Sequence, residues 1–275
     1  MQNHFFYESD DNMRYAVALE YDGASFGGWQ KQSTQPNTLQ AHLETALSRV
    51  ANHPVAVICA GRTDKGVHAT HQVIHFDTHS ERSEYGWRMG IQSHLPHEIR
   101  IKWLQPISDQ FHARYSAVAR RYRYFIRDGQ TQPALLYQKI TWVPGALDTS
   151  LMHEAAQCLL GEHDFSSFRA SQCQANTPFR NLHHITVTRY PQWICMDIQG
   201  NAFLHHMVRN IMGCLLLIGQ QRKPISWLAR VLDAKDRRCA SMTAAPDGLY
   251  LVDVIYKDDF ILPVSPIGPW FLNQV

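Results

Sequence analysis

The order in which strand patterns and helix patterns alternate along this chain limits its fold most strongly. A half-buried strand alternates apolar and polar side chains, whereas an amphipathic helix repeats its apolar side chains every three or four residues. By these criteria the 275-residue chain shows the order strand, helix, strand, strand, helix, strand twice. The first series is expected at 14–21, 38–51, 55–60, 71–77, 81–95 and 99–104. The second is expected at 117–127, 148–160, 183–190, 193–199, 205–218 and 249–256, with an additional short helix at 226–233.

This order is that of the split βαβ, or ferredoxin-like, motif. It predicts an α+β protein with two ferredoxin-like lobes, whose antiparallel-rich sheets are flanked by helices. We place the N-terminal lobe at 1–110 and the C-terminal lobe at 111–275, since the connection near 106–116 separates the two series. Two interrupted segments, 129–146 and 165–180, show no clear period and are expected to be loops.

Composition excludes several classes of protein. The six cysteines include no Cys-x-x-Cys pair, which excludes zinc-ribbon and thioredoxin signatures and favours a reducing compartment. The N-terminus lacks the basic and apolar regions of a signal peptide, and the apolar run at 211–219 is far too short to span a bilayer. We therefore expect a cytoplasmic protein that is not bound to a membrane. The net charge of +2 neither requires nor excludes a polyanionic partner.

The loop at 61–69 is the first candidate site. It places Asp64 between two cations, Arg62 and Lys65, directly after a β-rich run and between two glycines. Nearby positive charge favours the ionised carboxylate, and an ionised Asp is a usable nucleophile. The alternative is an ordinary surface turn, because Asp and Gly are common turn residues.

The segment 114–127 is the second candidate site, because it contains five arginines and three tyrosines. In a strand, Arg120, Tyr122 and Tyr124 would share one face. Arginines for phosphates beside an aromatic ring for a base are the usual means of RNA contact. The alternative is an edge strand with a solvated, charged face.

Two further groups of residues are weaker candidates for a functional site. Arg209 lies in an otherwise apolar helix and needs a partner if it is buried, for which Asp64 is one candidate and a structural ion pair elsewhere is the alternative. His68, His71 and His75 are the closest approach to a metal-ligand set, but no Cys or carboxylate set accompanies them. We interpret these histidines as surface residues and expect no metal.

The chain resembles the bacterial tRNA pseudouridine synthase A family along nearly its whole length. The resemblance is carried by several motifs in the right order, among them Gly-Arg-Thr-Asp at 61–64 and Asn-Ala-Phe-Leu-His-His-Met-Val-Arg-Asn at 201–210. The other matching runs lie at 20–23, 28–30, 66–68, 111–114, 119–124, 161–169 and 248–251.

The resemblance implies a cofactor-free isomerase that converts uridine to pseudouridine at positions 38, 39 and 40 of the tRNA anticodon arm. It also implies an active-site cleft between the lobes and a homodimer in which one tRNA contacts both subunits. Asp64 would be the catalytic aspartate, Tyr122 would stack on the target base, and Arg209 would pair with Asp64. Leu249 would form an apolar wall of the uracil pocket, and Arg62 would help to hold the target nucleotide out of the RNA helix.

Two positions depart from the family pattern. Lys65 stands where a small residue is usual, and Thr70 or His71 stands where a glycine is usual. We expect these changes to alter RNA affinity or loop conformation but not to abolish the chemistry. A non-catalytic protein that binds and refolds tRNA is the alternative function, since it would not need Asp64. A zinc-dependent nucleobase deaminase is disfavoured, because the chain lacks His-x-Glu followed by Pro-Cys-x-x-Cys.

Overall fold

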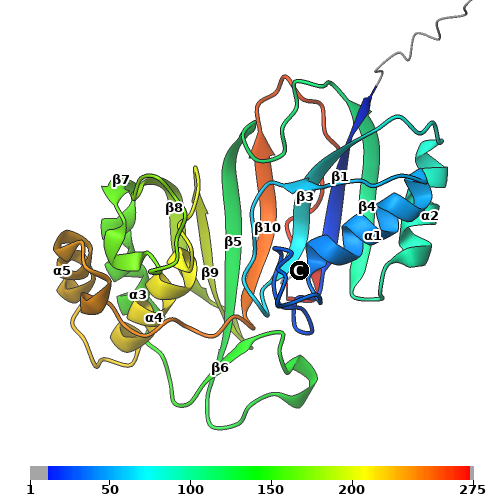
Figure 1. Ribbon diagram of the computed structural model, residues 1–275. Coiled ribbons are helices and arrows are strands. Elements are labelled where there is room, and N and C mark those ends of the chain that lie inside the picture. Colours follow the sequence, from blue (N-terminus) through cyan, green and yellow to red (C-terminus); the bar gives the residue numbers. More distant parts are fainter. Residues whose placement is uncertain (1–11, 273–275) are drawn as a thin grey trace, which may run out of the picture.

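A single ten-stranded sheet runs through both halves of the chain in the computed structural model, which describes residues 12–272 (Figure 1). Its strands are β1 (Met13–Tyr21), β2 (Ile58–Cys59), β3 (His68–Thr78), β4 (Ile99–Ile107), β5 (Ala117–Asp128), β6 (Thr141–Val143), β7 (Gly161–Asp164), β8 (Phe179–Arg189), β9 (Ile194–Gly200) and β10 (Leu249–Tyr256). The helices are α1 (Leu39–Ala51), α2 (Glu84–His94), α3 (Thr149–Ala156), α4 (Met207–Gly219) and α5 (Ser226–Ala234).

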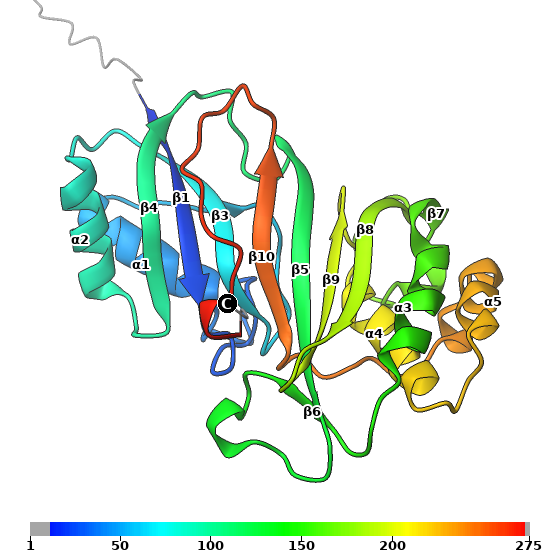
Figure 2. The same ribbon diagram turned by 180° about the vertical axis from the view of Figure 1, so that it is seen from behind.

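The N-terminal half has the strand order β4-β1-β3-β2, which is the order of a ferredoxin-like unit. Helix α1 begins after Thr38, whose side chain accepts a hydrogen bond from the backbone N–H of Ala41. Its apolar positions Leu39, Leu43 and Leu47 are buried, as the helical period predicts. Both α1 and α2 lie on one face of this half-sheet, and the C-terminal segment after β10 crosses the opposite face (Figures 1 and 2).

The C-terminal half repeats the order as β10-β5-β9-β8, with the short strand β7 added beyond β8. Helices α3, α4 and α5 lie at the end of the molecule far from α1 and α2 (Figure 1). Helix α4 is the central one, because ten of its thirteen residues are buried. The ferredoxin-like order predicted for each half is therefore confirmed.

Strand β10 joins the two half-sheets into one. It pairs antiparallel with β5 and parallel with β3, where Tyr250 faces His68 and Leu251 faces Ala69. Because β3 follows the 61–67 loop directly, this junction brings that loop beside the C-terminal half. The sequence pattern gave no sign of this joint, and the lobe boundary between 110 and 111 stays a prediction.

Smaller differences from the sequence-based expectations lie at element ends. Helix α4 begins at Met207, two residues later than predicted, so that His205 and His206 fall in the connection before it. The strands β6 and β7 lie in or beside the segments that showed no clear period. Among residues 12–272, no helix combines the length and the apolar character that crossing a bilayer requires.

Candidate active site

The backbone of the 61–67 loop is held from both sides. The carbonyl of Thr63 accepts a hydrogen bond from Trp29 N at 2.9 Å, and Val67 N closes a turn onto the carbonyl of Asp64 at 3.1 Å. Gly66 has a φ of +80°, where a side chain would be strained, and a Cβ there would lie 2.9 Å from the ring of Pro246. These contacts fix the direction in which the Asp64 side chain leaves the loop.

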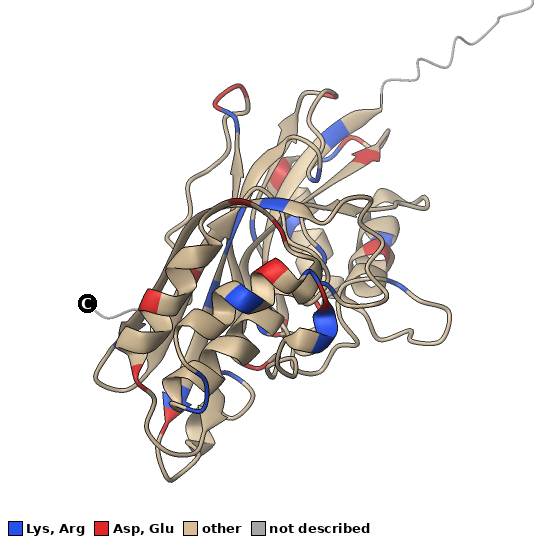
Figure 3. Cartoon of the chain, turned by 90° about the vertical axis from the view of Figure 1, so that its left-hand side faces the viewer, with Lys and Arg blue, Asp and Glu red and all other residues tan. Residues whose placement is uncertain are grey.

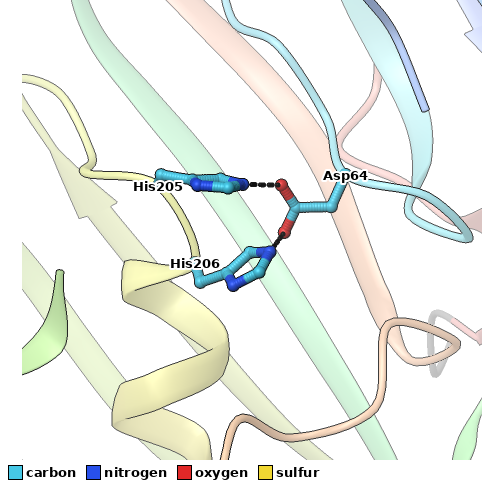
Figure 4. Close-up of side chains that lie close together, drawn as sticks. All are labelled: Asp64, His205 and His206. Atoms are coloured by element: carbon cyan, nitrogen blue, oxygen red, sulfur yellow. Dashed lines mark ion pairs between the residues drawn. The ribbon is translucent and has the colours of Figure 1, made fainter. Parts of the chain in front are cut away.

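The C-terminal half supplies three basic side chains to Asp64. Arg209 Nη1 lies 3.0 Å from Asp64 Oδ2, and its Nε donates to the carbonyl of Ala244 at 2.8 Å. His205 Nε2 lies 3.4 Å from Oδ1, and His206 Nε2 lies 3.4 Å from Oδ2 (Figure 4). The predicted pairing of Asp64 with Arg209 is thus observed, and it joins residues that are far apart in the sequence.

The connection before α4 is shaped to bring both histidines to one carboxylate. His206 has a φ of +62°, which is rare for a residue with a side chain. Helix α4 begins immediately after it, so Asp64 faces the positive end of the helix dipole. A costly backbone conformation at this point is typical of residues whose position matters for function.

The electrostatics of the site favour the ionised Asp64. Burial raises the pKa of this carboxyl, but the contact with His205 and the charges of His206 and Arg209 outweigh burial and hold the pKa below its usual value. Burial also lowers the pKa of His206, although the charge of Asp64 opposes this shift. Asp64 is therefore an anion at neutral pH and can act as a nucleophile or a base.

A pocket of about 360 Å³ opens beside the carboxylate. Residues from both halves of the chain line it, which agrees with the expected cleft between lobes. They are Ala24, Asp64, Lys65, Gly66, Gln138, His206, Arg209, Pro246 and Asp247. Lys65 stands exposed in this lining and forms no hydrogen bond or ion pair with any other described residue.

Asp64, His205 and His206 are the residues of the described chain whose ligand atoms converge enough to share a metal ion, within 4.8 Å of one another. The guanidinium of Arg209 already provides a positive charge on the same carboxylate. A metal ion bound there would be repelled by this charge, and the carboxylate already has its counter-charge in Arg209. We assign no metal to the site.

Tyr122 and Leu249 lie next to the site on the buried face of the sheet. Tyr122 is only 8% exposed, and its ring meets Phe203 edge-on with the centroids 5.1 Å apart. Burial raises the pKa of Tyr122, while Arg120 lowers it and the charge of Asp64 raises it further. Leu249 is buried at the start of β10, and its N–H donates to the carbonyl of Pro246. Neither residue lines the 360 Å³ pocket itself.

Arg62 is exposed at the other end of the loop. Its Nη1 donates to Gln174 Oε1 at 3.3 Å, so it points to the 165–180 segment and not into the pocket. Its expected role in holding a nucleotide is not tested by this geometry.

The alternative interpretation of 114–127, an edge strand with a solvated charged face, is wrong. Strand β5 is central in the sheet and is not an edge strand. Arg120 is 8% exposed and donates to backbone carbonyls, including those of Ala60 and Asn201. Arg121 and Arg123, on the opposite face, both bind Asp197. Basic and acidic positions are interspersed over the side of the molecule shown in Figure 3, without a single basic stripe.

The three histidines interpreted as surface residues are buried. His68 stacks on Tyr250 with the ring centroids 4.7 Å apart, and His75 accepts a hydrogen bond from Ala113 N. Burial lowers the pKa of both His71 and His75 to about 4. His71 and His75 are therefore neutral packing residues at pH 7, and among the described residues the three histidines form no group that could hold a metal.

His205 and His206 are functional candidates that the sequence analysis did not single out. The only sign of them in the sequence was that two adjacent histidines precede Arg209, by four and three residues. Periodicity placed them inside a helix, where neighbouring side chains diverge, and only the late start of α4 lets both reach Asp64.

Comparison with known proteins shows the family of this chain. The sequence pattern of the tRNA pseudouridine synthase family matches residues 17–116 and 155–257. Over 260 residues, 94% of this chain, it is 54% identical to tRNA pseudouridine synthase A of Shewanella amazonensis, of which the match covers 99%. The same share of this chain is 54% identical to 96% of the Aeromonas salmonicida enzyme and 52% identical to 98% of the Pseudoalteromonas atlantica enzyme, both of the same name.

A solved Cbf5–Nop10–Gar1 complex contains a chain that aligns with 89% of this one at 12% identity and a TM-score of 0.37, covering 50% of that chain. This likeness is too weak to add to the assignment. The sequence matches are strong and extend over nearly the whole chain, so the protein belongs to the tRNA pseudouridine synthase family and is an isomerase that acts on tRNA.

Proposed function

We propose that this protein isomerises uridines 38, 39 and 40 in the anticodon stem-loop of tRNA, with Asp64 as its catalytic residue. The observation that carries the proposal is the Asp64 carboxylate, which is bound by Arg209 from the other half of the chain at 3.0 Å and faces a pocket. The three positions and the catalytic role come from the resemblance to the family. The same resemblance supports a homodimer in the cytoplasm, in which one tRNA contacts both subunits.

The reaction breaks the N1–C1′ bond of the nucleotide, rotates the freed uracil and joins its C5 to C1′. The C5 hydrogen is lost and N1 gains one, so no external oxidant, reductant or energy source is required. An ionised Asp64 can start the reaction in three ways, by attack on C1′, by attack on C6, or by removal of the C2′ proton. Each route needs a carboxylate that is charged and fixed in direction, which Arg209 and the two histidines provide.

A uridine inside the anticodon arm cannot reach this carboxylate while it is stacked, so the base must leave the stack. A flipped pyrimidine binds well between an aromatic ring and an apolar wall, roles that we assign to Tyr122 and Leu249. Both are buried beside the site, and entry of the base would require the ring of Tyr122 to be uncovered. Arg62, exposed at the rim, is assigned to hold the nucleotide out of the helix.

Tritium release tests the central claim. Transcripts of tRNA labelled with tritium at uridine C5 are incubated with the wild-type protein, Asp64→Asn and Asp64→Ala. Release by the wild type and none by either variant, with tRNA binding retained, is the expected result. Transcripts in which only position 38, 39 or 40 is uridine then assign the sites one at a time.

Two outcomes would contradict the proposal in different ways. Equal release by wild type and Asp64→Asn would mean that another residue performs the chemistry. No release by any of the three proteins, with tight tRNA binding, would instead favour the non-catalytic tRNA-refolding function. Sedimentation of the protein with and without tRNA tests the homodimer separately.

A further inference from the structure

The two oxygens of Asp64 have unequal surroundings. Oδ2 receives both Arg209 Nη1 at 3.0 Å and His206 Nε2 at 3.4 Å. Oδ1 contacts His205 Nε2 at 3.4 Å and has no other hydrogen-bond or ion-pair partner among residues 12–272. Oδ2 is therefore the anchored oxygen, and Oδ1 is the one that is free to meet a substrate.

His205 is fixed in place but remains accessible. Its backbone N–H lies 3.4 Å from Cys173 Sγ, and its carbonyl accepts a hydrogen bond from Ala170 N at 3.1 Å. Its ring packs on His206 with the centroids 4.0 Å apart, whereas 37% of its side chain stays exposed. A carboxylate only accepts hydrogen bonds, so the ring nitrogen that faces Oδ1 carries the hydrogen. His205 thus holds an N–H donor at the open side of the reacting oxygen.

The reaction proposed above moves negative charge away from this oxygen. If Oδ1 attacks C1′, a C1′–O bond forms and the electron pair of the N1–C1′ bond leaves with the uracil. If Oδ1 removes the C2′ proton, a C1′–C2′ double bond forms and the same N1–C1′ pair leaves. In both cases the charge lost by Asp64 appears on the uracil, spread over N1, O2 and O4. Because O2 is bonded to the carbon next to N1, it is the carbonyl oxygen nearest to C1′ and to Oδ1.

We propose that His205 is a further catalytic residue, whose Nε2–H donates to Asp64 Oδ1 in the free enzyme and to uracil O2 as the N1–C1′ bond breaks. This inference rests on the proposed function. The imidazole transfers no proton, and it stabilises the departing uracil anion as the negative charge moves from Oδ1 to the base. A donor that is already in position stabilises developing charge strongly, because little reorganisation is needed at the moment of reaction.

The test pairs changes at His205 with changes at single atoms of the substrate. Anticodon stem-loops carry uridine, 2-thiouridine or 4-thiouridine at the target position, since sulfur accepts hydrogen bonds weakly. Single-turnover rates are measured for wild type, His205→Ala and His205→Gln, and for His206→Ala as the matched neighbour. Binding of the stem-loop and thermal unfolding show whether each variant is folded.

We expect His205→Ala to bind the stem-loop as wild type does but to react about 10²–10³-fold more slowly, which is the usual effect of removing one such donor. His205→Gln keeps an N–H donor and should recover part of the rate. The 2-thio substitution should slow the wild type and His206→Ala but leave His205→Ala with no further loss. The 4-thio substitution should slow all proteins by one common factor.

Either of two results would overturn the inference. A 2-thio effect of equal size in wild type and His205→Ala would show that His205 does not contact O2. Coupling of His205 to the 4-thio position alone would place its donor on the other carbonyl. Failure of the wild type to isomerise the unmodified stem-loop would instead refute the proposed function, so the two failures are distinguishable.

Discussion

Replacing Arg209 by Met tests how much the Asp64 ion pair contributes to both stability and catalysis. The two charges are 3.0 Å apart, and the side chains are 13% and 20% exposed. At an effective dielectric of about 20, such a pair attracts by about 5 kcal/mol. Desolvation and the two remaining histidine contacts offset roughly half, so we expect Arg209→Met to lower the free energy of unfolding by about 2–3 kcal/mol.

A double-mutant cycle, in which the free energy of unfolding is measured in urea, separates the contribution of the Asp64–Arg209 ion pair from that of the rest of the Arg209 side chain. Arg209→Met also removes the bond from Nε to the carbonyl of Ala244, at the same cost whether or not residue 64 is charged. The loss should therefore be smaller in an Asp64→Asn background, with a coupling energy of about 1–3 kcal/mol. Equal losses in the two backgrounds would refute the conclusion that the pair stabilises the fold.

Arg209→Met should also change the pH dependence of fold stability and of kcat/KM. Because the folded pKa of Asp64 is lowered, its ionisation stabilises the fold above the unfolded pKa, and this contribution is lost as the pH falls through the folded pKa. Without Arg209 the folded pKa rises, so the acid limb of kcat/KM should move to higher pH in Arg209→Met but not in Arg209→Lys. An unchanged acid limb in Arg209→Met would mean that another group controls it.

Three further predictions concern other contacts of the site. Tyr122→Ala should reduce turnover far more than tRNA binding, and equal losses in single-turnover and filter-binding assays would exclude the stacking role. Lys65→Ala should weaken tRNA binding and reduce the slope of log K against log salt by about 0.7–0.9, whereas an unchanged slope would mean that Lys65 meets no phosphate. Arg120→Met should destabilise the fold by about 3–5 kcal/mol in urea, since it leaves the buried carbonyls of Ala60 and Asn201 without their donor, and a loss below 1 kcal/mol would contradict this account.

The local elements were predictable because they depend on short-range patterns. The apolar stripe of α1 and the full extent of β10 both follow from periodicity. The joint between β3 and β10 was not predictable, because strand pairing between residues about 180 positions apart leaves no trace in either strand's own period. The joint brings the N-terminal half against β5, where Arg120 is buried and donates to the carbonyl of Ala60.

The site was predictable where a side chain requires a partner of one chemical kind and the sequence offers few of them. Arg209 in an apolar helix required a carboxylate, and Asp64 was a candidate with nearby cations of its own. The histidines show the opposite case. His68, His71 and His75 are buried although histidine is polar, and His205 contacts Asp64 only because of a backbone conformation with positive φ at the next residue.

The placement of the ion pair across the two halves has a consequence for the reaction. Asp64 lies in the loop just before β3, whereas Arg209 and both histidines belong to the connection before α4 and to its first turn. Arg120 on β5 binds the backbone on both sides of the site. Its guanidinium donates to the carbonyl of Ala60, just before the Asp64 loop, and to that of Asn201, before the histidines. A shift of one half against the other would therefore separate Asp64 from Arg209 and both histidines together. The pairing of β3 with β10 and the buried Arg120 oppose such a shift and so help to keep the carboxylate aimed into the pocket.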